Sequence, residues 1–132
     1  MRVGWQSWSL EVSDEWSVTD HPECLSLTLS NEGALQVSSA RKQNGFVAEQ
    51  DLLFPEEERE SWGKWKPVHC GEFDGIVYEY TQEGIVWRRW FLRNGPVLLF
   101  VTYNGTPDAA KREAAAVSKV LNTARAEAGG EA

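Results

Sequence analysis

Apolar and polar residues alternate with a period of two along most of this chain, the pattern of strands that turn one face toward a core. The stretches that show it are about 5–12, 24–29, 34–39, 67–73, 75–81, 85–93 and 96–103. Turn residues separate several of them, as at Asn31-Glu32-Gly33, where a hairpin is expected. The pattern predicts a central antiparallel sheet of about six to seven strands.

Two further turns organise the second half of the predicted sheet. Thr81-Gln82-Glu83-Gly84 joins two of its strands, and Asn94-Gly95 is the strongest hairpin signal in the chain. Pro96 has no N–H with which to close a two-residue turn back to Arg93. We therefore expect the turn at Asn94-Gly95 to be open or slightly longer.

Two segments have apolar residues at helical spacing. From Val47 to about Glu60, apolar positions at near-helical spacing are interspersed with acids, and Pro55 must break or restart the helix. A second helix is predicted at 107–126, after an N-cap at Thr106. Its apolar stripe consists of Ala110, Ala114, Val117, Val120, Leu121 and Ala124.

The hairpin register decides which residues share a face of the sheet. If Leu92 pairs with Val97, Arg88 lies on one face. Glu79 is its neighbour there, whereas Arg89 lies on the other face with no partner that the sequence identifies. Both faces are largely apolar, so either helices cover both or one aromatic face is open for a ligand or partner. Because two helical segments are available, we favour an α+β fold in which helices flank the sheet in a three-layer sandwich.

Length and charge narrow the class of protein. The 132 residues suit one domain, expected over 1–127 with a frayed tail at 128–132. Acidic residues outnumber basic ones by 20 to 13, a formal net charge of −7, which disfavours nucleic acid and anionic membranes as partners. No apolar run has the length of a signal peptide or a membrane span, so a cytoplasmic location is expected. Cys24 and Cys70 either pair or remain two buried thiols, and a cytosolic location favours the thiols.

A cluster of potential metal ligands lies at His69, Cys70, Glu72 and Asp74. Neighbouring residues of a strand point to opposite faces, so His69 and Cys70 cannot hold one ion without a bulge. The chain also lacks a phosphate-binding loop, a dinucleotide fingerprint and a nucleophile elbow. We therefore expect no metal, no cofactor and no enzymatic activity.

Trp62 and Trp65 are the sharpest pointer to a binding site. They lie in a polar loop at 61–67, beside Lys64 and Lys66. Tryptophan is enriched among the residues that dominate protein interfaces, so this loop is a candidate anchor for a partner. The alternative is that one or both tryptophans fold back and cap the sheet. The candidate partner-binding residues are Trp62, Trp65, Arg88 and Arg89.

The order of elements and three local patterns resemble the PsbP-like superfamily. The patterns are a strand that turns into a tryptophan at 10–16, a glycine-bounded turn into a strand at 71–78, and a strand at 98–103 followed by the closing helix. Ser13 and Glu15 depart from the Pro-x-Gly-Trp that members often show in the first pattern. The superfamily includes the extrinsic subunit of photosystem II, a Ran-binding nuclear-import factor and effector-loading chaperones of type VI secretion. The resemblance implies a sheet flanked by helices and a binding or assembly role, and no family site residue carries over.

Two classes of function remain. The first is a non-catalytic bacterial protein-binding domain, as an adaptor, chaperone or immunity-like protein, whose partner is another protein of basic charge. A purely structural accessory domain of a complex differs from it only in what the complex is. The second class is a small-ligand-binding protein or enzyme with a pocket around Tyr78, Trp87 and Arg89. A cavity lined by Arg89 and a carboxylate would favour the second class, and a closed sheet–helix interface would exclude it.

Overall fold

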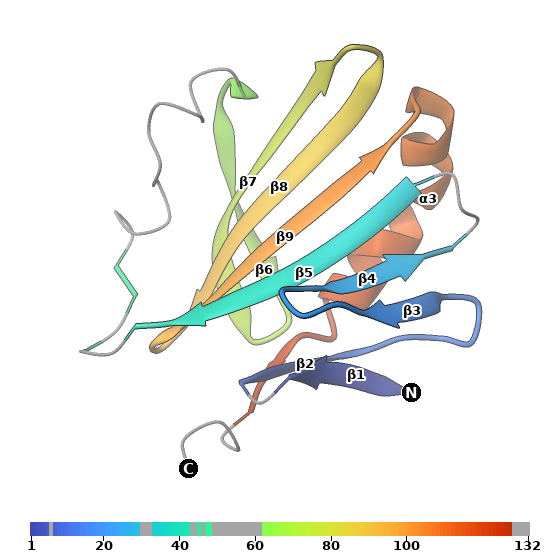
Figure 1. Ribbon diagram of the computed structural model, residues 1–132. Coiled ribbons are helices and arrows are strands. Elements are labelled where there is room, and N and C mark those ends of the chain that lie inside the picture. The colour runs from blue at the N-terminus through green and yellow to red at the C-terminus, as the bar shows by residue number, and fades with distance from the viewer. Residues whose placement is uncertain (6, 30–32, 43–44, 46, 49–61, 128–132) are drawn as a thin grey trace.

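A computed structural model describes residues 1–5, 7–29, 33–42, 45, 47–48 and 62–127 of the chain (Figure 1). Its main element is a seven-stranded sheet in which every neighbouring pair is antiparallel, with the order β3-β4-β5-β9-β8-β7-β6. The strands are β3 (Ser17–Asp20), β4 (Leu25–Thr28), β5 (Gly33–Arg41), β6 (Trp65–Cys70), β7 (Phe73–Gln82), β8 (Ile85–Asn94) and β9 (Val97–Gly105). An antiparallel sheet of six to seven strands is confirmed, but the stretch expected as one of its strands at about 5–12 is not part of it: that stretch is divided between two strands of a separate, smaller sheet, and β3 belongs to the large sheet instead.

A helix and a smaller sheet pack on one face of the large sheet. Helix α3 (Pro107–Leu121) begins after Thr106, whose hydroxyl accepts a hydrogen bond from the Ala109 N–H at 3.2 Å, so the predicted N-cap is confirmed. The smaller sheet has the order β1 (Arg2–Trp5), β2 (Trp8–Glu11) and β10 (Arg125–Ala126). Figure 1 shows α3 behind β4 and β5, with the small sheet at the lower edge. Within the described ranges α3 is the single helix.

Helix α3 ends earlier than its apolar spacing predicts. Instead of continuing to residue 126, the chain turns after Leu121, and Arg125–Ala126 pair with β2. The Ala126 N–H donates to the Glu72 carboxylate at 2.9 Å, and the Ala124 carbonyl accepts from the Glu72 N–H at 2.9 Å. These bonds tie the segment to the turn between β6 and β7, and this tertiary pairing outweighs helical spacing.

The β8–β9 hairpin has a different register from the one predicted. Asn94 pairs with Val97 and Leu92 with Leu99, so the loop is Gly95-Pro96 and the predicted Leu92–Val97 pairing is wrong by two residues. Gly95 has a φ of 57°, the left-handed region that glycine adopts without strain. Pro96 then occupies a loop position where its missing N–H is not needed. A shift of two preserves the alternation, so every side chain stays on its predicted face.

Of the other two turns in this half of the sheet, the β7–β8 turn agrees with the prediction and the β6–β7 turn does not. The β7–β8 turn lies at Glu83 and Gly84, whose φ values of 53° and 81° suit a tight two-residue hairpin, and it confirms the expected connection. Strand β6 was expected at 67–73, but it begins at Trp65 and ends at Cys70, and Phe73 already belongs to β7. Gly71 makes the earlier turn at a φ of 61°.

The two faces of the large sheet carry two separate cores. On the α3 side, the core includes Trp8, Leu10, Leu35, Val37, Trp90, Leu99, Val117 and Leu121. On the second face, a smaller cluster consists of Val47, Trp62, Ile76, Tyr78 and Phe91, with Tyr80, Leu98 and Phe100 packed against it. Val47 is not helical, and its N–H donates to the Gly95 carbonyl at 2.9 Å. Ala48 is not helical either, so the expected helix does not begin at Val47; the remainder of it, 49–60, and the expected tail at 128–132 lie outside the described residues.

The α3 side is fixed by a buried polar pair. The Tyr103 hydroxyl donates to the Glu113 carboxylate at 2.6 Å, and the two residues are 1% and 3% exposed. Burial first, and then the neighbouring carboxylate, raise the pKa of the Tyr103 hydroxyl far above its usual value. The raised pKa keeps the proton on the Tyr103 hydroxyl, and its hydrogen bond to Glu113 anchors α3 to β9.

Both cysteines are free thiols, so the disulfide alternative is excluded. Cys70 is 3% exposed, and burial raises the pKa of its thiol to about 11. Cys24 is half-buried on the second face.

The Cys70 thiol makes stability depend on pH in the alkaline range. In the unfolded chain the Cys70 thiol has a pKa of about 8.5, whereas in the folded chain its pKa is about 11. Its contribution to the free energy of unfolding is therefore complete below about pH 8.5 and is lost as pH rises through about 11. We expect the free energy of unfolding, measured in urea at pH 8 and pH 10, to fall less in Cys70→Ala than in the wild type. Cys24→Ala is the control and should keep the wild-type fall; an equal fall in all three proteins contradicts this origin.

Candidate functional site

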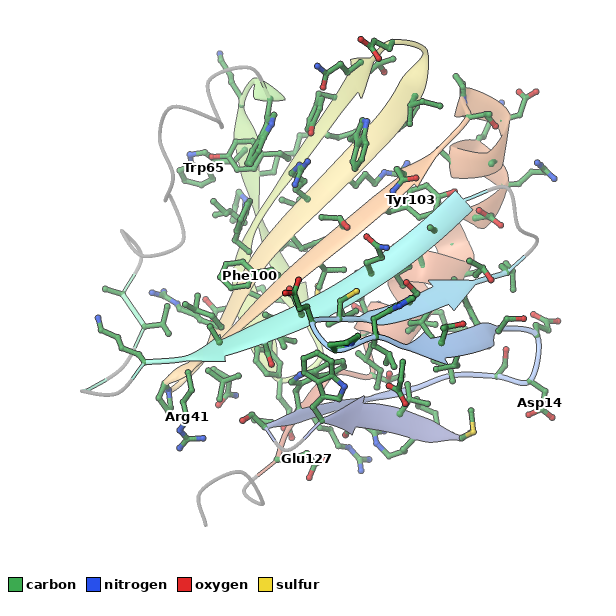
Figure 2. All side chains as sticks on the ribbon, viewed as in Figure 1. Asp14, Arg41, Trp65, Phe100, Tyr103 and Glu127 are labelled. Carbon is green, nitrogen blue, oxygen red and sulfur yellow. The ribbon has the colours of Figure 1, made fainter. Side chains whose placement is uncertain are left out.

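The structure separates the two tryptophans that the sequence grouped in one loop. Trp62 folds over the second face and is 7% exposed. Trp65 is the first residue of β6 and is 37% exposed, so its expected loop position is corrected to a sheet edge. Trp62 is therefore part of a core, whereas Trp65, labelled in Figure 2, has an indole that is partly exposed to solvent.

Trp62 is the centre of an aromatic cluster on the second face. Its ring stacks on Tyr80, with centroids 6.0 Å apart and planes 4° apart, and on Phe91 at 5.9 Å and 14°. Tyr78 meets the same indole edge-on at 5.3 Å. Offset stacks and edge contacts of this kind are favourable beyond the area they bury. The cluster arises because β7 and β8 place large rings at alternate positions in register.

Arg89 lies among these rings instead of beside an acid. Its Cζ is 4.6 Å from the Trp62 ring centroid and 5.1 Å from that of Trp87. Its Nε donates to the Tyr80 hydroxyl at 2.8 Å. The aromatic faces stabilise the cation through the ring quadrupoles. The sequence left Arg89 without a partner, yet the alternation had already placed Tyr80 and Trp87 on its face.

Arg88 lies on the opposite face, apart from Trp62, Trp65 and Arg89. It is directly opposite Glu79 in the β7–β8 ladder, and its Nε is 3.2 Å from the Glu79 carboxylate, which confirms the predicted neighbour. Its Cζ is also 5.9 Å from the Tyr103 ring centroid. Arg88 is therefore engaged on the α3 side of the sheet.

A cavity of about 410 Å³ lies on the second face, next to this cluster. Arg89 and Trp62 line it together with residues of β5 and β9 and with Cys24, which directly precedes β4. Its lining consists of Cys24, Gln36, Ser38, Trp62, Arg89, Trp90, Phe91, Phe100, Val101 and Thr102. The lining combines one cation, several rings and neutral polar groups, and it contains no carboxylate among the described residues. It meets one of the two conditions set for a ligand pocket, the presence of Arg89, and not the other.

Three polar residues of this lining were missed from the sequence. Gln36 and Ser38 look like solvent-facing positions of a strand, and Thr102 looks like an unremarkable position on β9. The alternation does show that they share a face, but it does not show that Gln36 pairs with Thr102 and Thr102 with Arg89. The pairing across β5, β9 and β8 brings them to the cavity.

The Tyr78 hydroxyl is buried, and no residue in the described part of the chain hydrogen-bonds to it, although Tyr78 is 1% exposed and its ring is well packed. Leaving such a group unsatisfied costs about 1–3 kcal/mol. We expect Tyr78→Phe to leave the free energy of unfolding unchanged or raise it by up to about 1 kcal/mol, measured by urea denaturation. Tyr103→Phe removes the same atom from a hydrogen-bonded pair and should lower stability; a loss of equal size in Tyr78→Phe contradicts the assignment.

The potential metal ligands at 69–74, which were not expected to form a site, are divided as the strand geometry requires. His69 is exposed and Cys70 is buried, so the two side chains occupy opposite faces of β6. Across the described part of the chain, no three His, Cys, Asp or Glu residues gather closely enough to hold a metal ion. Nor does any helix in that part have the length and apolar character needed to cross a membrane.

Comparison with known proteins identifies similar folds and no family. No protein-family model and no curated protein matches the chain. A solved protein of Bacteroides thetaiotaomicron VPI-5482 aligns with a TM-score of 0.64 and 15% identity over 93% of this chain and 46% of that one, so this chain spans about half its length. LpqN of Mycobacterium tuberculosis, described as involved in cell envelope biogenesis, aligns with a TM-score of 0.59 and 12% identity, covering 96% and 90% of the two chains. At these identities the likeness shows the fold alone.

Proposed function

We propose that this chain is a non-catalytic bacterial protein-binding domain, acting as an adaptor, chaperone or immunity-like protein in the cytoplasm. The observation that carries the proposal is the second face of the large sheet, where the exposed Trp65 lies at the edge, two strands from Arg89 and the cavity that Arg89 lines. Trp65 is directly opposite Tyr78, and Tyr78 is opposite Arg89, so the three form one continuous row across β6, β7 and β8. Tryptophan and arginine are both enriched among the residues that dominate the binding energy of protein interfaces.

The charge of the chain supports a partner that is basic overall. A formal net charge of −7 attracts a basic protein over the distances at which encounter is steered. The PsbP-like resemblance supports the same class of function, since members of that superfamily are mostly adaptors and assembly factors. The three-layer arrangement, in which helices flank both faces of the sheet, belongs to this proposal as well.

The test is capture of the partner by wild-type and Trp65→Ala proteins. Trp65 is 37% exposed, so its replacement should leave the fold intact, whereas Trp62 is core and its loss confounds a double variant. We expect one protein to be enriched by the wild type and reduced at least tenfold by Trp65→Ala, measured by affinity capture at low salt with mass spectrometry. Lys111→Ala, on the exposed side of α3, is the matched control and should capture normally.

The proposal fails if folded Trp65→Ala enriches the same proteins as wild type to the same extent. It also fails if Lys111→Ala loses capture as Trp65→Ala does, because α3 lies on the other face of the sheet. Circular dichroism and urea denaturation of each variant establish that the fold is retained.

A small-ligand-binding protein is the second candidate, and the cavity favours it. Its volume of about 410 Å³ lies within the range of about 300–1,000 Å³ that small-molecule sites span. Apolar rings with a few polar groups are the usual lining of such sites. A ligand that co-purifies with the protein, found by native mass spectrometry and lost in Arg89→Gln, would favour this candidate over the first.

A further inference from the structure

Arg89 has hydrogen-bonding capacity that the described structure does not use. A guanidinium has five N–H donors, and Nε–H is the one that Tyr80 accepts. No other described residue accepts a hydrogen bond from Arg89, and no described carboxylate lies within ion-pair distance of it. Arg93 lies further along β8 on the same face. Its Nε is 3.5 Å from the Asp74 carboxylate, and its Nη1 donates to the Val47 carbonyl at 3.3 Å. Among the described residues, Arg89 thus differs from Arg93 in having no carboxylate partner and in lining a cavity.

The surroundings hold Arg89 in place as a cation. Trp62 and Trp87 lie 4.6 and 5.1 Å from its Cζ, and the Tyr80 hydroxyl fixes Nε. The side chain is half-buried, so its unused donors are partly removed from bulk water. A cation that is oriented before binding loses less conformational entropy when an anion arrives. The aromatic neighbours therefore prepare the guanidinium for an external acceptor.

The remaining cavity wall suits a carboxylate attached to an apolar body. Gln36, Ser38 and Thr102 supply neutral polar groups, whereas Trp62, Phe91 and Phe100 supply apolar rings. A planar guanidinium pairs with a planar carboxylate through two parallel hydrogen bonds. On a chain of net charge −7, a dianion such as phosphate meets stronger repulsion than a single carboxylate does. The single cation and the apolar rings of the lining therefore suit a monovalent acid with an apolar body.

We propose that the cavity beside Arg89 binds a carboxylate carried by the partner protein, an Asp or Glu side chain flanked by apolar residues. This inference rests on the proposed protein-binding function and specifies what the second face recognises. In the sheet register Trp65 and Arg89 are two strands apart, about 10 Å, with the buried Tyr78 between them, so an extended segment of the partner is long enough to contact both. A basic partner steered by the acidic surface then presents one acidic residue at the contact.

The test uses two blocked peptides that differ in charge alone. Acetyl-Leu-Glu-Leu-amide and acetyl-Leu-Gln-Leu-amide are titrated into the wild-type protein up to about 10 mM, the range for a single weak contact. Binding is followed by the Arg89 Nε–H and Trp62 indole N–H resonances and by the rate at which iodoacetamide alkylates Cys24, which lines the cavity. We expect the Glu peptide to shift both resonances and slow Cys24 alkylation, and the Gln peptide to bind roughly tenfold to a hundredfold more weakly.

Two variants separate the charge from the fold. Arg89→Gln should lose the preference for the Glu peptide. Because Arg89 packs on two indoles and its loss can disturb them, Gln36→Glu provides an independent variant: Gln36 is exposed, and a carboxylate there repels the peptide's carboxylate while Arg89 stays. It should also weaken the Glu peptide by about tenfold and leave the Gln peptide unchanged. Equal binding of the two peptides by wild type, or absence of binding by both, overturns the inference.

Two further arms identify the source of the carboxylate and keep the two proposals apart. Phenylacetate and inorganic phosphate are titrated in the same way; tighter binding of either than of the Glu peptide overturns the choice of a protein carboxylate. Partner capture by Arg89→Gln should fall as it does for Trp65→Ala. If Arg89→Gln and Gln36→Glu capture the partner normally while Trp65→Ala does not, this inference fails and the protein-binding function stands. If Trp65→Ala captures normally, the proposed function itself fails.

Discussion

Trp62→Ala is expected to lower the free energy of unfolding by about 3–5 kcal/mol, the usual cost of deleting a large buried aromatic side chain. Trp62 is 7% exposed, and its ring centroid lies 5.3 to 6.0 Å from those of Tyr78, Tyr80 and Phe91. Its loss also removes one of the two rings that flank Arg89. The expected loss of stability therefore has two causes: a cavity in the smaller core, and the loss of one of the two rings that stabilise the Arg89 cation.

The measurement is urea denaturation of Trp62→Ala beside Trp65→Ala. The control removes the same side chain from a position three residues along the chain, where it is 37% exposed, and should cost less than about 1 kcal/mol. Trp62→Phe keeps a ring in the stack and should recover part of the loss. If the two alanine variants lose equal stability, Trp62 is not the packed centre of the second face.

Gly75→Ala is expected to cost about 3 kcal/mol because the added methyl group has no space to occupy. A Cβ at this position would contact the Phe91 carbonyl oxygen and lie 2.9 Å from its carbon and 3.0 Å from the Leu92 Cα. These are backbone atoms of β8, paired with β7 in the middle of the sheet, so no side-chain rotation relieves the overlap. The strands must separate locally, which weakens the ladder that supports the aromatic cluster.

The matched control for Gly75→Ala is Gly84→Ala. Gly84 has a φ of 81°, and a Cβ there would meet no atom within 4 Å. Its replacement isolates the strain of a left-handed alanine, about 1 kcal/mol. Thermal or urea unfolding should rank Gly75→Ala as the more damaging by about 2 kcal/mol. A reversed ranking would show that backbone crowding between β7 and β8 is not what selects glycine at 75.

The Trp62 and Trp65 variants also bear on function, because they distinguish the residues that stabilise the second face from those available to bind a partner. Trp62, Tyr78 and Phe91 are buried and hold the face together, so their loss is read in stability. Trp65 and Arg89 contribute less to the core, so their loss should be read in binding. The sequence suggested that Trp62 and Trp65 form one binding site in the loop at 61–67. In the structure the first residue stabilises the face and the second is available for binding.

The sequence alone determined the parts of this protein that depend on local periodicity. Alternation in β7, β8 and β9 identifies the strands, and it assigns each side chain to a face even though the β8–β9 register is wrong by two residues. The turn at 81–84, the cap at Thr106 and the Glu79–Arg88 pair follow from residue types at short spacing. Such signals are readable because both partners lie within a few residues, or one hairpin, of each other.

The tertiary structure decided what covers each face and which residues meet there. Alternation cannot tell that Trp62 is buried and Trp65 exposed, because burial depends on the face each indole meets. Nor can it bring Gln36, from an N-terminal strand, to the cavity beside Arg89, because that needs the pairing of β5 with β9 and β9 with β8. Residue 126 leaves the helix for the same reason, since its hydrogen bonds come from β2 and Glu72. Contacts between distant segments carry no period along the chain, and the candidate site is made of such contacts.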